Sequence, residues 1–326
     1  MMTGGSTVMR MVALAFLAIV QSMAVAQQFP SKAVNLVVTV PAGGSIDAMA
    51  RTIAPELARA LGQPVLVENR AGASGNIAAD FVARAPADGH TLLITSSSTL
   101  TLNAHVYKSV PFNPEKSFAP IVMPARLNMI LAVHPKMNVS TFPEFVAQVK
   151  AQGDKLNYGS SGNATLPHLA GALLMIRIGG RSNHVPYKGI APALNDLLSG
   201  QLDYMFDSAS SVPHVKAGKL RALAVVGPNR LVALPDVPTL RELGVPNMEL
   251  AGGWYGILAP AGTPRPVIQR LNTEMVRILR MPEVIDRFNS FGLEPTSSTP
   301  EELATALHDD FTRLGPVVQQ IGLKLE

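Results

Sequence analysis

The sequence has no cysteine among its 326 residues, which excludes disulfides, thiolate metal sites and a lipid anchor on an N-terminal cysteine. Aromatic residues make up 5% of the chain and charged residues 15%, and the formal net charge is +4. The basic residues form no cluster that could follow a phosphate backbone, so nucleic acid is not an expected partner. A hydrophobic content of 47% indicates a globular chain, and its length allows two domains.

Long hydrophobic runs are also missing. The N-terminal run MVALAFLAIV covers ten residues, whereas a membrane-spanning helix needs about 20, and no later run is long enough. Arg10 precedes this run, and AVA at 24–26 supplies the small residues that a signal peptidase reads. This order predicts an export signal over residues 1–26, cleaved after Ala26. Without a lipid anchor, the mature chain is expected in a Gram-negative periplasm.

Histidines are few and scattered, and none are paired at the spacing of helical metal ligands. Because thiolates are absent too, we expect neither a metal nor another cofactor. His168 follows a glycine-rich turn and is a candidate ligand contact. The alternative is a part-buried structural histidine, which is the commoner role.

Short apolar runs alternate with amphipathic helical patterns along most of the chain. Strands are predicted at 35–40, 64–69, 91–96, 129–134, 156–160, 184–187, 202–207 and 221–226. Helices are predicted at 45–61, 75–84, 142–152, 166–178 and 191–198, and the chain after Pro264 is mostly helical. This alternation indicates an α/β fold with parallel sheets covered on both faces.

Two glycine- and serine-rich turns each join a predicted strand to a predicted helix. The first is PAGGSIDAMAR, with Gly43, Gly44 and Ser45, and the second is LNYGSSGNATLPHL at 156–169. Ligands of open α/β sheets bind beyond the carboxyl ends of strands, where the following helix presents free N–H groups. The two turns together predict an anion clamp. Each turn alone is also compatible with an ordinary well-capped helix start.

Three catalytic interpretations of these turns lack a required residue. A phosphate loop needs a lysine after the glycines, and a dinucleotide fingerprint needs three spaced glycines. A nucleophile elbow needs G-x-S-x-G, and the run from Gly159 to Asn163 lacks the last glycine. A periplasmic serine hydrolase using Ser161 with His168 stays as an alternative, without the spacing of a triad.

Several ordered motifs resemble the exported solute-binding proteins of tripartite tricarboxylate transporters, the Bug receptors. They include PAGGSIDAMAR, LNYGSSGNATLPHLAG, VPYKGIAPALNDLLSGQLDYMFD, LPDVPTLRELGVP and APAGTP. The resemblance implies a periplasmic-binding-protein fold, with two α/β lobes around a cleft joined by a hinge. It also implies a receptor and not an enzyme, and a ligand that is a small organic acid or acidic amino acid. A ligand sensor for a membrane kinase would share this site and differ only in its partner.

The resemblance also places the lobes. Lobe I is expected at 27–125 and 250–326 and lobe II at 126–249, in a monomer that delivers its ligand to membrane transporter subunits. Pro124 and Pro246 lie near the expected crossings between the lobes. Trp254, the only tryptophan, is expected either in the core of lobe I or at the hinge.

The ligand-binding residues implied by the resemblance lie at the ends of predicted strands. Asp47 has two open roles: favourable charge in the first turn of a helix, or an acceptor for a ligand amine or hydroxyl. Lys188 either supplies fixed positive charge or is a solvated surface lysine. The full set is Gly43, Gly44, Ser45, Asp47, Ser97, Ser98, Ser160, Ser161, Gly162, Asn163, Tyr187, Lys188 and Asp207, with Ser74, Gly75, Asn76 and His168 as secondary candidates.

Overall fold

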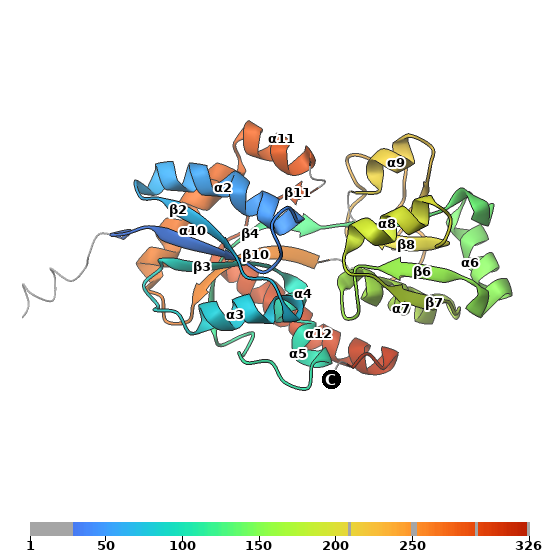
Figure 1. Ribbon diagram of the computed structural model, residues 1–326, viewed down its shortest axis with the longest axis horizontal. Helices are drawn as coiled ribbons and strands as arrows, with labels where there is room; N and C mark the ends of the chain where they lie inside the picture. The colour runs from blue at the N-terminus through green and yellow to red at the C-terminus, as the bar shows by residue number, and fades with distance from the viewer. Residues whose placement is uncertain (1–28, 208–209, 249–252, 291–292, 325–326) are drawn as a thin grey trace, which may run out of the picture.

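The chain folds into two α/β lobes that lie next to each other along the long axis of the molecule (Figure 1). The computed structural model describes residues 29–207, 210–248, 253–290 and 293–324. The predicted export signal at 1–26 lies outside these residues.

The first lobe contains a six-stranded sheet in the order β11-β4-β10-β3-β1-β2. Strands β1, β2 and β3 are parallel, whereas β10 runs antiparallel to β3 and β4. The strands are β1 Val34–Val38, β2 Val65–Asn69, β3 Thr91–Ser96, β4 Phe118–Leu127, β10 Gly253–Pro260 and β11 Glu294–Pro295. The helices are α2 Ser45–Leu61, α3 Asn76–Ala83, α4 Ser97–Leu100, α5 Asn103–Val106, α10 Arg265–Leu279, α11 Pro282–Ser290 and α12 Pro300–Ile321.

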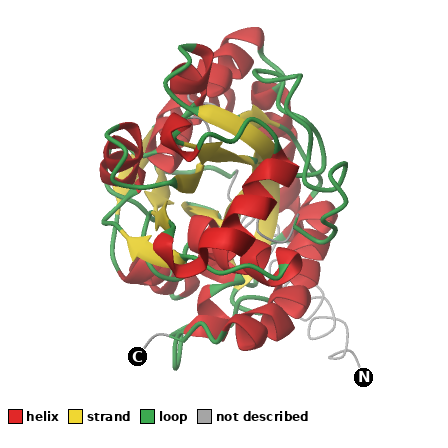
Figure 2. Cartoon of the chain, turned by 90° about the vertical axis from the view of Figure 1, so that its right-hand side faces the viewer, coloured by secondary structure: helices red, strands yellow, loops and turns green. Residues whose placement is uncertain are grey.

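The second lobe contains a five-stranded sheet in the order β7-β6-β8-β5-β9. Viewed from the end of this lobe, helices surround its strands (Figure 2). The strands are β5 Met129–Val133, β6 Asn157–Ser160, β7 Asn183–Pro186, β8 Tyr204–Asp207 and β9 Arg221–Val226. The helices are α6 Phe142–Gln152, α7 Leu166–Ile178, α8 Ile190–Leu198 and α9 Val212–Lys216.

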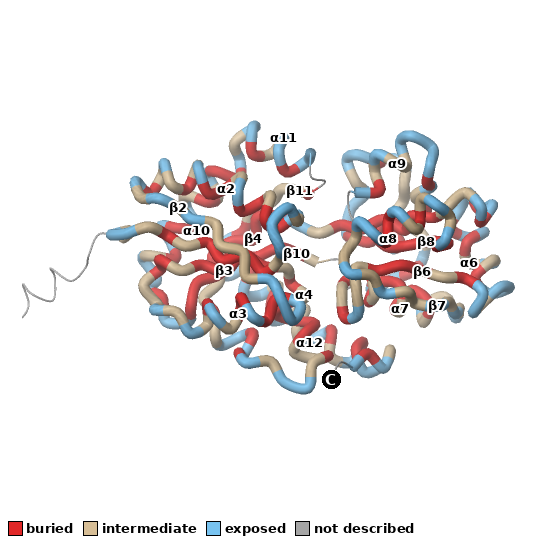
Figure 3. Tube along the Cα trace, viewed as in Figure 1, coloured by how far each residue is buried: buried red, intermediate tan, exposed pale blue. Residues whose placement is uncertain are grey.

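Helix α2 shows how the sequence pattern produces this packing. Its apolar residues recur at helical spacing, so Met49, Ile53 and Leu57 form one stripe that is fully buried in the first-lobe core. The opposite face is exposed (Figure 3). The helix ends at Gly62, whose φ of +69° is the left-handed conformation that glycine adopts at low cost.

The sheets are mixed, which differs from the prediction of parallel sheets. The antiparallel members β4 and β10 carry the chain out of the first lobe and back into it. Strand β4 ends at Leu127 and β5 begins at Met129 in the other sheet, so the crossing there is immediate. A strand that leaves the first lobe and a strand that returns to it must run in opposite directions. This requirement makes the sheet mixed, although the alternation of strands and helices in the sequence indicates a parallel sheet.

Helix α12 is a third connection between the lobes. Its first half packs Leu303 and Leu307 into a first-lobe cluster. Its second half packs Leu314 and Val318 into the large cluster of the second lobe. The lobes are therefore joined by two strand crossings and by one helix that contacts both cores.

Candidate functional site

A cavity of about 1080 Å³ lies between the two lobes. This volume suits a small molecule. Both lobes contribute hydroxyl groups and apolar side chains to its wall. The polar lining is Thr39, Ser45, Ser74, Ser96, Ser98, Thr99 and Tyr255 from the first lobe, and Ser161, Thr165 and Lys188 from the second.

Five helices begin at the wall of this cavity. Their N-cap residues are Gly44 for α2, Gly75 for α3, Ser96 for α4, Thr165 for α7 and Gly189 for α8. All five residues line the cavity, and no side chain of a cap residue accepts from its helix. The first-turn N–H groups of these helices therefore lack helical partners, and their dipoles add positive potential in the cavity. Because α4 is a single turn, it contributes N–H groups but little dipole.

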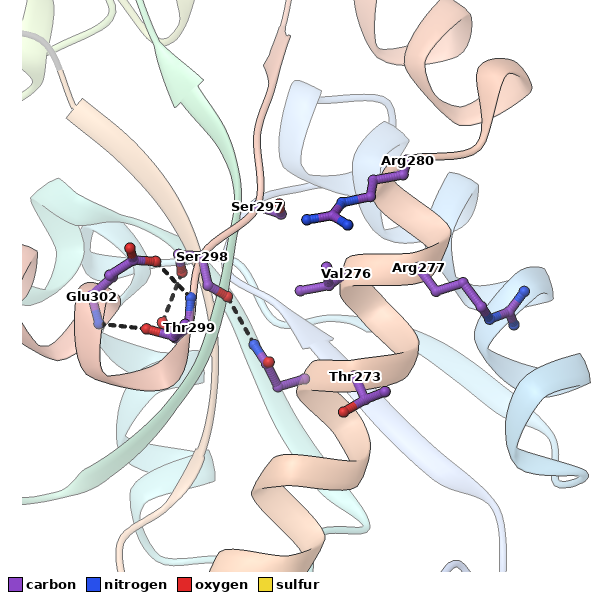
Figure 4. A pocket seen from close by; sticks show the side chains of 9 residues that line it. Thr273, Val276, Arg277, Arg280, Ser297, Ser298, Thr299 and Glu302 are labelled. Atoms are coloured by element: carbon purple, nitrogen blue, oxygen red, sulfur yellow. Dashed lines mark hydrogen bonds between the residues drawn. The ribbon is translucent and has the colours of Figure 1, made fainter.

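The start of α12 is different, because it carries a capping box. Thr299 accepts from the backbone N–H of Glu302, and the Glu302 carboxylate accepts from the N–H of Thr299, at 3.1 and 2.8 Å (Figure 4). A surface pocket of about 680 Å³ borders this helix start. At this helix start the N–H groups of Thr299 and Glu302 are satisfied by side chains, whereas the five helix starts at the cavity between the lobes have no such side-chain cap.

The first predicted turn is held in shape by Asp47. The carboxylate is 3% exposed and accepts from the Gly43 N–H at 2.8 Å, from Asn69 at 2.9 Å and from Arg51 at 3.0 Å. Burial alone would raise the pKa of Asp47, but the hydrogen bonds from Arg51, Gly43 and Asn69 outweigh it and lower the pKa. Asp47 does not line the cavity, and this placement favours the first-turn role over contact with a ligand.

The second predicted turn is held by a pair of stacked histidines. The rings of His168 and His184 lie 3.7 Å apart with 7° between their planes. His184 Nε2 lies 2.6 Å from the hydroxyl of Ser160, which is fully buried, and His168 Nδ1 accepts from the Ala164 N–H at 3.2 Å. Burial lowers the pKa of His168 to about 4, and burial together with the neighbouring His168 lowers the pKa of His184 to about 4. Both rings are therefore neutral at pH 7.

The pairing required by the hydrolase alternative is not formed. Among the described side chains no hydrogen bond joins Ser161 to His168, and the serine hydroxyl that contacts a histidine is that of the buried Ser160. Ser161 lines the cavity instead. The second predicted turn thus contacts a pair of stacked histidines and, among its described residues, contains no nucleophile hydrogen-bonded to a base in the arrangement that the hydrolase alternative requires.

Other candidates of the second lobe are divided between cavity and interior. Lys188 is exposed and lines the cavity, whereas the Tyr187 hydroxyl donates to Asp196 at 2.6 Å. Burial, together with Asp196, raises the pKa of Tyr187 to about 12. Asp207 is fully buried and accepts from Ser210 and Ser211. Gly162 and Asn163 are not part of the cavity wall.

The serines of the first lobe are divided in the same way. Ser98 lines the cavity and its hydroxyl lies 2.9 Å from that of Ser96. Ser97 is buried and accepts from the backbone N–H of Trp254 at 3.4 Å. Ser74 and Gly75 line the cavity, whereas the buried Asn76 accepts from Asn103 and Gly43 lies outside the wall.

Trp254 combines both of its expected positions. It is 3% exposed and packs in a first-lobe cluster, and its indole N–H donates to Asp310 at 2.7 Å. It also lies at the start of β10, the strand on which the chain returns to the first lobe. It is a core residue next to the hinge.

Sequence reasoning missed Thr39 and Tyr255. Thr39 borders the cavity and is 4% exposed, but its hydroxyl oxygen is buried and has no hydrogen-bond partner among the described residues. The Tyr255 hydroxyl lies 3.3 Å from that of Ser45, across 210 positions of sequence. Thr39 had a local signal, because it is a polar residue near the end of the apolar run NLVVTV. Tyr255 had none, because only the fold brings its strand to this place.

The described residues contain no group of three or more histidine, aspartate or glutamate side chains placed to hold a metal ion. Within the same residues, no helix has the length and apolar character to cross a membrane.

Comparisons with known proteins agree with this architecture. Residues 49–323 match the family model described as "Tripartite tricarboxylate transporter family receptor". Protein BugT of Bordetella pertussis is 35% identical over 303 residues, which cover 92% of this chain and 93% of BugT.

Two solved structures are similar over most of the chain. Rpa4515 of R. palustris with adipate is 32% identical with a TM-score of 0.81, covering 91% of this chain and 99% of that one. MatC of Rhodopseudomonas palustris with bound malate is 33% identical with a TM-score of 0.77, covering 89% and 100%. The two-lobed fold and the resemblance to Bug receptors are confirmed, as is the expectation of a receptor instead of an enzyme. The chain belongs to the tripartite tricarboxylate transporter family of receptors.

Proposed function

We propose that this receptor captures a small carboxylate-bearing ligand in the cavity between its lobes and delivers it to a tripartite tricarboxylate-type transporter. The observation that carries the proposal is the convergence of five helix starts on one cavity. In the described lining Lys188 is the only charged side chain, so no carboxylate there would repel an anion. Fixed N–H groups, and not guanidinium groups, are the main source of positive potential.

The similar receptors support the ligand class, because their structures hold adipate and malate. For this chain we propose direct contacts from the predicted residues that line the cavity. These are Gly44, Ser45, Ser74, Gly75, Ser98, Ser161 and Lys188. The hydroxyl of Tyr255 is added to this set on structural grounds.

Binding is expected to require the charge of a carboxylate. A hydrogen bond to a charged group contributes roughly 1.5–3 kcal/mol, so the amide analogue of a bound acid should bind at least about tenfold more weakly. A thermal-shift screen of carboxylic acids identifies a ligand, and calorimetry then compares the acid with its amide. Equal affinities of acid and amide would contradict the proposal.

The cellular setting is part of the same proposal. We place the mature receptor in the periplasm as a monomer, after cleavage following Ala26. Mass spectrometry of the secreted chain measures the cleavage site, and light scattering measures the oligomeric state. An uncleaved chain retained in the cells would contradict this setting without affecting the ligand class.

A further inference from the structure

A third pocket, also of about 680 Å³, lies at the hinge, and we call it the hinge pocket. Its wall includes Arg126 and Trp254 from the first lobe, Arg177 at the end of α7 in the second lobe, and Arg313 on α12. Each connection between the lobes thus borders this pocket, and its volume lies within the range of small-molecule sites.

The hinge pocket and the ligand cavity lie on opposite faces of the crossing strands. Successive residues of a strand point to opposite faces. At the first crossing Leu127 borders both pockets, Met129 lines only the ligand cavity, and Arg126 and Asn128 line only the hinge pocket. On β10, Tyr255 lines the cavity and its neighbour Trp254 lines the hinge pocket. The hinge pocket is therefore a separate site.

Charge in the hinge pocket is strongly unbalanced. Arg126, Arg177 and Arg313 are exposed, and in the described part of the chain none has a carboxylate within ion-pair distance. Arg241 is a fourth guanidinium in the wall. Asp310 is the one carboxylate among the described lining residues, and the Trp254 indole already donates to it. Three guanidinium groups without an ion pair among the described residues thus share the wall with one carboxylate, and that carboxylate already accepts from Trp254 and lies in the field of Arg313 and Arg126.

We propose that the hinge pocket is a second binding site, which takes a small multivalent oxyanion of the phosphate type. Guanidinium groups match such anions because their N–H donors form a planar fork that binds two oxygens at once. Because Arg177 and Arg313 approach from different elements, one anion with several oxygens bridges them. The concave shape and limited volume suit a small ion better than a polymer.

The test titrates the purified receptor with sodium pyrophosphate at low ionic strength, followed by calorimetry and by the fluorescence of Trp254. One saturable site per chain is expected, with a change in Trp254 emission because the indole lies in the wall. In the double variant Arg177→Gln/Arg313→Gln the affinity is expected to fall at least about tenfold. The matched control is Arg181→Gln, another exposed arginine without an ion pair among the described residues, which should keep the affinity within about twofold.

Three results would overturn the proposal. The first is no saturable binding below about 1 mM pyrophosphate. The second is equal weakening by Arg181→Gln, which would indicate attraction by overall charge. The third is binding that survives in the double variant but is lost in Gly44→Asp, which would place pyrophosphate in the ligand cavity. Thermal melts of all variants test whether they remain folded, as is expected for the arginine variants because those positions are exposed.

Discussion

Replacing Gly44 with aspartate is expected to abolish ligand binding while leaving the receptor as stable as the wild type or slightly more so. Gly44 is the N-cap of α2, and its φ of −75° and ψ of 167° are extended values that any residue adopts at an N-cap. An aspartate there can accept from the free N–H groups of α2, which contributes a few tenths of a kcal/mol relative to glycine. The added Cβ would lie 3.2 Å from Val40 Cγ2, so that side chain must shift slightly.

The loss of binding has two causes. The new carboxylate occupies the N–H groups that we assign to the ligand, and it places a like charge beside the ligand carboxylate. Two like charges about 4 Å apart repel by roughly 4 kcal/mol at an effective dielectric constant of 20, so the affinity should fall at least about 100-fold. Calorimetry with an acid found in the screen measures this loss, and a thermal melt measures stability.

The matched control is Gly44→Asn, which caps the helix without adding charge. It should weaken binding less than Gly44→Asp at similar stability, because only the competition for N–H groups remains. A Gly44→Asp variant with wild-type affinity would show that the start of α2 does not meet the ligand. Loss of both folding and binding would show a structural role for this glycine.

The local periodicity of the sequence was sufficient to predict the position of most helices and strands. Helices α2 and α6 and strands β3 and β9 have the predicted bounds, because each buries one continuous apolar set. The crossing strands β4 and β10 were not predicted. Pro120 and Pro124 interrupt the strand pattern of β4, and glycines interrupt that of β10. Their pairing joins Arg126 to Trp254, a contact that no local pattern contains.

Part of the cavity wall was also predictable from a local signal. Glycine and serine after a strand mark the place where a helix begins, and this signal identified Gly44, Ser45 and Ser161, which line the cavity. The same signal cannot tell which way a side chain points. Ser160 and Asp207 are therefore interior residues, although they end strands that lead to the cleft. Both lobes contribute residues to the cavity wall. Which of these residues lie together depends on the whole fold, so a local sequence pattern does not identify them.

Acidification is expected to destabilise the receptor through the stacked pair His168 and His184. Both pKa values fall from 6.5 to about 4 on folding, so the folded state prefers the neutral rings. Between these pH values the unfolded chain binds more protons than the folded one. Stability is therefore fully present above about pH 6.5 and is lost as the pH falls toward 4.

The size of the effect follows from linkage. Two fully shifted histidines would remove roughly 2.5 kcal/mol of unfolding free energy between pH 7 and 5.5. Both rings are partly exposed, so solvent screening reduces this estimate to about 1 kcal/mol. Urea unfolding at the two pH values measures the loss. This window lies above the range in which carboxylates titrate, so Asp47 and similar groups contribute little to it.

Variants distinguish the contribution of His168 and His184 to the pH dependence of stability from that of the other histidines. The double variant His168→Gln/His184→Gln is expected to lose most of the pH dependence between pH 7 and 5.5, whatever its absolute stability. His134, whose pKa is also lowered by burial, is present in both proteins, so its contribution cancels in the comparison. The control is His214→Gln, on α9, which packs on the sheet face opposite to α7 (Figure 1). It should keep the wild-type dependence. If the double variant keeps the wild-type dependence as well, the stacked rings already accept a proton in the folded state, and the second turn is not held by neutral histidines.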